Sequence, residues 1–178
     1  MPTISQTNRP LLRFVLLLAG LFGLFNVAFY AWIAESEFLE RYLALNARVS
    51  APLIRFFDTD AQADGIEVRS PRFSLEVKHG CDALQPAAFF VFAVLGSPVG
   101  ISLRRRVLPI LIGTAGLMTL NIVRIITLFY TGLKFPTWFE TMHLDIWQAV
   151  FIFVPLVFWI TWARRATRKP REHANASR

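Results

Sequence analysis

The chain has 178 residues, of which 54% are hydrophobic, and it carries a formal net charge of +7. A mean hydropathy of +0.46 argues against a soluble fold, and the single Cys excludes an internal disulfide. The basic residues are clustered beside apolar runs, which is typical of membrane topology signals. We therefore expect no nucleic-acid partner, although a basic chain invites that interpretation.

Four apolar runs are each long enough, at about 20 residues, to cross about 30 Å of hydrocarbon. They cover approximately residues 11–33, 83–103, 107–130 and 143–163. The first run is longer than a signal-peptide core, and the AESEF that follows is a poor cleavage site. The sequence therefore predicts a single all-α membrane domain with four transmembrane helices.

Basic clusters orient these helices, because positive charge in short loops favours the cytoplasmic side. The clusters consist of Arg9 and Arg13, of Arg104, Arg105 and Arg106, and of Arg164, Arg165, Arg168, Lys169 and Arg171. They predict that both termini are cytoplasmic and that residues 34–82 and 131–142 lie outside. We expect a multi-pass protein of the bacterial inner membrane, with a disordered cytoplasmic tail at 168–178.

The outer segment, residues 34–82, has a pattern of its own. Apolar residues recur at helical spacing at Phe38, Tyr42, Leu45, Val49, Leu53 and Phe56. This predicts an amphipathic helix on the membrane surface or over the bundle, interrupted near Pro52. The following DTDAQADG predicts a loop. The alternating apolar residues on either side of RSPR then predict a small hairpin.

This topology brings three chemically capable residues to the outer leaflet. Cys81 lies just before the second predicted span and His143 just before the fourth. Arg124 lies about six residues inside the outer end of the third, which is about 9 Å of helix. We therefore expect the three side chains to converge.

Arg124 is the strongest single signal, because an arginine within a membrane helix costs about 2.5–3.5 kcal/mol on insertion scales. Asn121 lies one turn earlier, so that NIVR presents an amide and a guanidinium on nearly the same face. The alternative is that Arg124 extends outward to lipid headgroups.

The surroundings of Cys81 allow two interpretations. A lone Cys is commonly a small buried hydrophobic residue, but one at the start of a helix can be stabilised as a thiolate. Gly80 would permit close approach of a peptide backbone. Asp82 either opposes thiolate formation or caps the helix that follows.

His143 is the preferred acid/base, although it could simply be a histidine at the membrane interface. Trp147, one turn later, is expected to help bury its ring. His79 remains a rival base, because it is only two residues from Cys81. A thiol, a histidine and a cation together suit acyl transfer. We expect no metal site and no cofactor, because the Cys and His residues lack ligand spacing.

These motifs resemble those of the exosortase and archaeosortase family of membrane cysteine transpeptidases. The resemblance rests on HGC ending at Cys81, on N-x-x-R from Asn121 to Arg124, and on a His before the last helix, here His143. It covers about residues 80–160 and implies that Cys81 is the nucleophile, Arg124 the carbonyl or oxyanion partner, and His143 the acid/base. The chain departs from many members in having Asp82 and Ala83 after the cysteine, and in its small number of spans. The short form resembles exosortase H.

The resemblance implies substrates and partners. These are exported proteins with a C-terminal sorting signal made of a short motif, a transmembrane helix and a basic tail. Cleavage at the periplasmic face would pass the acyl group to water, a lipid or a glycan amine. The substrate motif, the acceptor and the oligomeric state are left open.

Other function classes compete with this one. In a non-enzymatic scaffold or transporter subunit, Arg124 would bind an anionic group and Cys81 would be a bystander. A thiol oxidoreductase lacks a second, resolving Cys. Acylation of Cys81 by a lipid is a further alternative.

Overall fold

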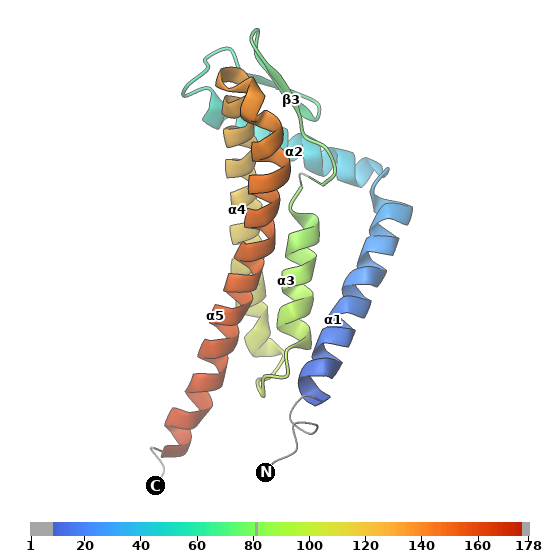
Figure 1. Ribbon diagram of the computed structural model, residues 1–178, viewed down its shortest axis with the longest axis vertical. Coiled ribbons are helices and arrows are strands. Elements are labelled where there is room, and N and C mark those ends of the chain that lie inside the picture. Colours follow the sequence, from blue (N-terminus) through green and yellow to red (C-terminus); the bar gives the residue numbers. More distant parts are fainter. Residues whose placement is uncertain (1–8, 81, 176–178) are drawn as a thin grey trace.

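The computed structural model describes residues 9–80 and 82–175, with side chains through residue 167. Four helices run along the long axis, and α2 crosses them at one end beneath a small sheet (Figure 1). The helices are α1 (Arg9–Ala28), α2 (Glu37–Ile54), α3 (Leu84–Gly96), α4 (Arg104–Lys134) and α5 (Trp147–Asn175). A π-helical segment, η1 (Phe29–Ile33), continues α1. A 3-10 turn, η2 (Pro136–Trp138), and a π-helical segment, η3 (Thr141–Ile146), precede α5.

Three helical stretches among the described residues are long and apolar enough to cross a membrane. They are Arg9–Ile33, Arg104–Lys134 and Pro136–Thr167. These contain the first, third and fourth predicted apolar runs, each extended at one or both ends. The last helix also continues to Asn175, so that the tail expected to be disordered is helical over much of its length.

The second predicted run differs, because α3 has only 13 residues and ends at Gly96. A helix of that length rises about 20 Å, less than the roughly 30 Å of hydrocarbon. The expected helix over 83–103 is therefore wrong at its C-terminal end. Pro98 is the local reason, because a proline disfavours helical geometry in the residue before it. Ser97 accordingly leaves the helix with ψ of 130°.

Arg106 stabilises this early end. Its buried guanidinium donates to the carbonyls of Val94 and Leu95, both at 2.7 Å, and to that of Val99 at 2.8 Å. The last carbonyls of a helix have no partner within it, and water is scarce inside a bundle. One cation from α4 thus replaces the hydrogen bonds that a longer α3 would have made.

The amphipathic helix between the first two apolar runs is present as α2. Ser36 begins it by accepting the N–H of Leu39 at 3.2 Å. The predicted interruption at Pro52 is wrong, because the helix continues to Ile54. The face buried against the bundle carries Leu39, Leu43, Asn46, Ala47, Ser50, Ala51 and Ile54. Much of the predicted apolar stripe, including Phe38, Leu45 and Val49, is instead exposed beside it.

The predicted hairpin is confirmed, and the structure adds a third strand to it. Strands β1 (Gln62–Asp64), β2 (Glu67–Arg69) and β3 (Ser74–Glu76) form an antiparallel sheet in the order β1-β2-β3. Strand β1 occupies part of the segment predicted to be a loop. Val68 pairs with Leu75 at the centre of the register, and both side chains are buried. The sheet packs on α2 and α4. It covers the end of the bundle from which α3 starts.

We predict that Arg106→Ala lowers the free energy of unfolding by about 3 kcal/mol, because it leaves three backbone carbonyls without partners. Thermal unfolding of the purified protein in neutral detergent measures this. Arg164→Ala, which removes an exposed guanidinium near the same end, is the control and should change stability little. Equal stability of the two variants would contradict the role assigned to Arg106.

Candidate active site

Arg124 is buried within the bundle rather than extended to the membrane surface. It is 7% exposed, and its Nη1 donates to the carbonyl of Gly80 at 3.3 Å. The guanidinium carbon lies 5.4 Å from the ring centroid of Phe151 on α5. The alternative in which this side chain reaches outward to headgroups does not fit this geometry. Arg124 instead joins α4 to α5 and to the loop that precedes α3.

The loop from residue 80 to residue 83 is tight. Cys81 lies outside the described residues, but both of its neighbours are described. Gly80 has φ of +85° and Ala83 has φ of +60°, so that two left-handed residues occur within four positions. A left-handed alanine is strained, and such strain clusters at functional sites. The loop therefore needs other contacts to hold it.

Asp82 provides two of these contacts. Its carboxylate is buried, and it accepts the N–H of Leu84 at 2.8 Å and the N–H of Gly80 at 3.1 Å. The first bond caps the start of α3, which was one of the two roles expected for Asp82. The second bond closes the loop across residue 81. Asp82 thus fixes the backbone on both sides of the cysteine.

A chain of polar contacts supports this loop from α2. Tyr42 donates its hydroxyl to the carbonyl of Asp82 at 2.7 Å. Burial raises the pKa of Tyr42; the Asn46 side chain opposes this and the Asp82 carboxylate adds to it. The hydroxyl therefore keeps its proton and remains a donor. Asn121 on α4 donates to Asn46 at 3.3 Å and is fully buried. Asn121 thus faces α2, where it supports the site indirectly.

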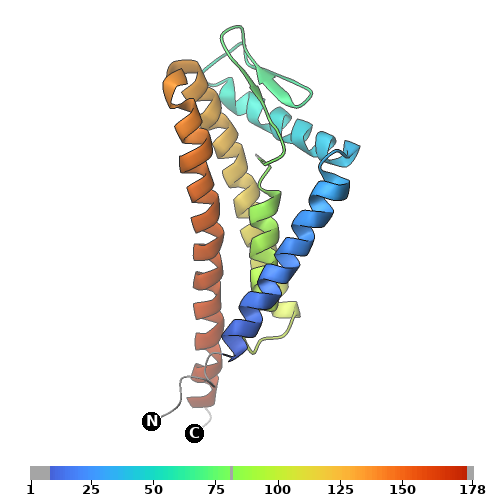
Figure 2. The ribbon, with the colours of Figure 1, turned by 45° about the vertical axis from the view of Figure 1, so that its right-hand side comes forward.

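Two cavities meet at Arg124. The first, of about 530 Å³, extends from Gly80 and Asp82 down between α1, α3 and α5. Its polar end holds Gln85 and Gln148 beside Arg124, and its remaining lining is mostly apolar and aromatic. In Figure 2, α1 and α5 lie close together at the end where the chain begins and separate toward the other end.

The second cavity, of about 340 Å³, is a groove between β3 and α4. Six consecutive residues, 73–78, form one wall, and Arg124, Ile125 and Leu128 form another. Phe139 and His143 close it. Arg124 and His143 therefore share this groove, and Arg124 also reaches the first cavity and the carbonyl before Cys81.

His143 lies within the π-helical segment η3, and π-helical turns are frequent at functional sites. The aromatic ring of Phe139 lies beside the His143 ring, with the two centroids 5.8 Å apart. Trp147 was expected to help bury His143, but its own ring has another function. It donates to the Thr127 hydroxyl at 3.0 Å and fastens the start of α5 to α4.

His79, the rival base, lies in a different place. It is exposed, and its ring packs edge-on against Tyr30 with centroids 6.4 Å apart. It lines neither cavity at Arg124. His143, and not His79, therefore shares a cavity with Arg124.

Three further residues belong to this site and were not singled out from the sequence. Tyr42 holds the loop, while Gln85 and Gln148 supply amides to the first cavity. Gln85 also donates to Asn26 at 3.2 Å and to Tyr30 at 3.0 Å, which ties α3 to α1. Each glutamine is the second residue of an apolar helix, and a polar side chain at such a position is a signal that the sequence carries.

Within the described parts of the chain, no three His, Cys, Asp or Glu side chains gather closely enough to hold a metal ion. The polar groups at Arg124 are instead hydrogen-bond donors and a titratable histidine. Such groups suit binding or polarisation of a carbonyl oxygen.

Comparison with protein-family models, with curated proteins and with solved structures finds no match to this chain. The geometry of the site and its sequence motifs are therefore what indicate a function for this chain.

We predict that Gly80→Ala destabilises the protein by about 1–2 kcal/mol, because alanine at φ of +85° is strained even though the space around a Cβ is open. Gly100→Ala is the matched control, since that glycine is also unobstructed and is not in the left-handed region. Thermal unfolding of both variants in the same detergent measures the difference. Indistinguishable midpoints would show that the left-handed geometry at Gly80 is not required.

Proposed function

We propose that this chain is a membrane-embedded cysteine peptidase or transpeptidase of the exosortase type, with Cys81 as nucleophile. The observation that carries the proposal is the contact of Arg124 with the loop. Its buried guanidinium hydrogen-bonds the carbonyl of Gly80, the residue immediately before the cysteine, and lines both neighbouring cavities. A charge that is costly to bury is thus held at the residue that precedes the single cysteine of the chain.

The proposed reaction uses three groups. The Cys81 thiolate attacks the carbonyl carbon of the scissile peptide bond, and Arg124 stabilises the negative charge that develops on the oxygen. Protonated His143 gives its proton to the leaving nitrogen, and the C–N bond breaks to leave a thioester. Neutral His143 then takes a proton from water or an amine acceptor as that group attacks the thioester and releases the thiolate.

The first cavity suits the apolar part of a substrate. A sorting signal of the expected kind places a transmembrane helix directly after its cleavage motif. A helix approaching between α1 and α5 would meet the mostly apolar wall and present its outer end to Arg124. In this proposal α3 acts as the fourth span, although it is short. Its irregular ends are tolerable because the bundle and its arginines satisfy them.

The second cavity suits the motif itself. Phe73 accepts from Ser70, and Val77 donates to Ile66, so the backbone of these odd-numbered residues bonds to the residues that flank β2. The intervening residues Ser74 and Glu76 consequently direct their backbone groups toward the opposite edge. No other strand of the described chain pairs with that edge. An extended peptide could therefore add to β3 beside Arg124 and His143.

The proposed mechanism predicts how strongly each substitution slows processing of the substrate. Cys81→Ala should abolish processing of an exported protein that ends in a motif, an apolar helix and a basic tail. Arg124→Gln and His143→Gln should each slow processing by at least about 100-fold. The measurement is the size of the exported protein on an immunoblot, with the level and melting temperature of each variant determined in parallel.

His79→Gln is the matched histidine control and should process normally, because His79 packs on Tyr30 outside both cavities. Processing that survives Cys81→Ala would refute the enzyme proposal. Arg124 would then be better studied as a binding residue in a non-enzymatic membrane protein.

Strand addition makes a separate prediction. Glu76→Pro removes one outward N–H from the free edge of β3 and should slow processing by about tenfold, because one main-chain hydrogen bond to the substrate is lost. Glu76→Ala is the control, since it removes the same exposed side chain, with its ion pair to Lys78, but keeps the N–H. Equal rates for two equally stable variants would exclude the β3 edge as the docking strand.

A further inference from the structure

A third hollow lies at the end of the molecule opposite the candidate active site. It has a volume of about 860 Å³ and lies between the first turns of α4, the loop before them and the last described turns of α5. Arg104 and Arg105 of α4 and Arg165 of α5 line it together with Leu108, Pro109 and Trp162. Three guanidinium groups from two separate helices thus border a partly apolar hollow.

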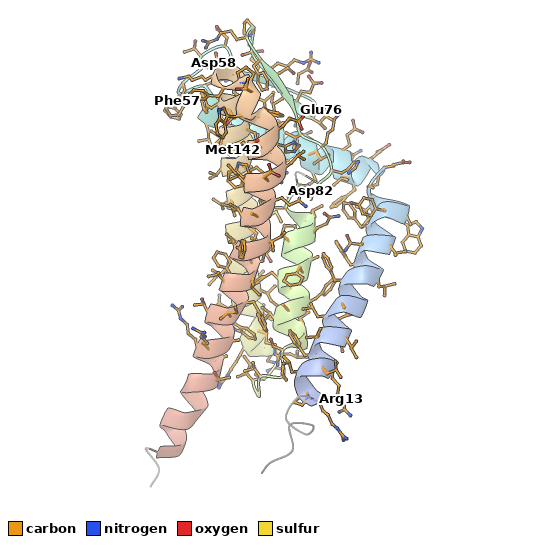
Figure 3. All side chains as sticks on the ribbon, viewed as in Figure 1. Arg13, Phe57, Asp58, Glu76, Asp82 and Met142 are labelled. Atoms are coloured by element: carbon orange, nitrogen blue, oxygen red, sulfur yellow. The ribbon has the colours of Figure 1, made fainter. Side chains whose placement is uncertain are left out.

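The described side chains supply no carboxylate to the positive charge at this hollow. The described ion pairs all lie between residues 37 and 78, in α2, the sheet and the loops beside them. Residues 9–34, 83–139 and 146–167 contain no Asp or Glu. Figure 3 shows this separation, with Asp58, Glu76 and Asp82 at one end and Arg13 at the other. Among the side chains that the structure describes, no carboxylate therefore lies at the three arginines, which leaves their charge to attract an anion from outside the protein.

The neighbouring Arg106 differs from these three residues. It is buried, and its guanidinium is used by three backbone carbonyls. Its guanidinium carbon also lies 6.0 Å from the ring centroid of Trp162, which helps to hold the indole at the wall of the hollow. Arg104 and Arg105, by contrast, are exposed. Of Arg104, Arg105 and Arg106, it is therefore Arg106 that has the structural role.

The position of the hollow along α4 fits the boundary of a membrane. Arg104 precedes Arg124 by 20 residues of continuous helix. That is about 30 Å, the thickness of the hydrocarbon. If Arg124 lies near one face of the membrane, the hollow lies near the other. Guanidinium groups there can reach headgroup phosphates, while Leu108, Pro109 and the indole of Trp162 offer an apolar surface to acyl chains.

We propose that this hollow binds the headgroup of one anionic phospholipid. Its phosphodiester would lie between the start of α4 and Arg165, with an acyl chain along the apolar wall. Such a lipid would join the two helices by an ionic contact that the described side chains do not supply. The proposal is independent of peptidase activity, because none of its residues takes part in the proposed reaction.

The test uses the full-length protein, purified in neutral detergent. Its melting temperature is measured with added phosphatidylglycerol, with phosphatidylcholine and with inorganic phosphate. We expect phosphatidylglycerol to raise the midpoint by several degrees in a saturable manner, because a ligand of the native state stabilises it. Phosphatidylcholine and phosphate should have little effect. Phosphate alone reproducing the shift would identify a small-anion site and overturn the lipid proposal, as would the absence of any phosphatidylglycerol-specific shift.

Matched charge variants locate the effect. The combination of Arg104→Gln, Arg105→Gln and Arg165→Gln should lose the phosphatidylglycerol shift. The combination of Arg13→Gln, Arg48→Gln and Arg164→Gln removes the same charge from exposed positions that do not line the hollow, and it should keep the shift. Equal shifts in the two variants would show diffuse attraction and refute the site.

Single substitutions guard against a triple variant that fails to fold. Arg105→Gln and Arg165→Gln should each weaken binding of phosphatidylglycerol about fivefold, from the roughly 1 kcal/mol that one cation contributes at an anionic surface. Native mass spectrometry of the retained lipid measures this against Arg164→Gln. Unchanged retention in both single variants would contradict the proposal whatever the triple variant does.

Discussion

Two arginines of one helix hold both ends of α3, and the rest of the site depends on this. Arg106 donates to carbonyls at the end of α3, and Arg124 donates to the carbonyl of Gly80 just before its start. They are 18 residues apart on α4, which is about 27 Å. A helix of 13 residues with irregular backbone at both ends would leave unsatisfied carbonyls inside an apolar bundle. The two guanidinium groups donate hydrogen bonds to these carbonyls, and their own charge is buried within the bundle and away from lipid.

The same arrangement explains the tight loop at residues 80–83. Its left-handed Gly80 and Ala83 would not persist without contacts that hold them. Asp82 bonds to both flanking N–H groups, and Tyr42 and Arg124 bond to two of the carbonyls. These contacts come from α2, α4 and the loop itself. The backbone positions of Gly80, Asp82 and Ala83 therefore depend on contacts from the whole end of the molecule that carries α2 and the sheet (Figure 1).

Acidic and basic side chains lie toward opposite ends of the long axis of the molecule. The acidic side chains that the structure describes, and all described ion pairs, belong to the end that carries α2 and the sheet. At the opposite end no described carboxylate pairs with the arginines. Such a division supports an orientation with the basic end toward the cytoplasm, which belongs to the proposed function together with the periplasmic site. Under the two proposals, the two ends would recognise different chemistry, a peptide at one and an anionic headgroup at the other.

The sequence by itself determined the three long apolar helices, the amphipathic helix, the hairpin and the importance of Arg124. Each follows from a local property: the length of an apolar run, a repeat of 3.6 or 2 residues, or the cost of a charge in hydrocarbon. Topology alone also placed Arg124 and His143 at the same end of the bundle. Their shared groove agrees with that expectation, while the position of Cys81 lies outside the described residues.

Only the tertiary structure decided the length of α3, the stripe of α2 that is buried, and the partners of the site residues. Hydropathy continues past Gly96, but Pro98 and the donation from Arg106 end the helix there. Asn121 and Trp147 face α2 and Thr127, because side-chain direction around a helix depends on which neighbour packs against it. Those neighbours are distant in the sequence. Local spacing could therefore select the residues of this site but not their contacts.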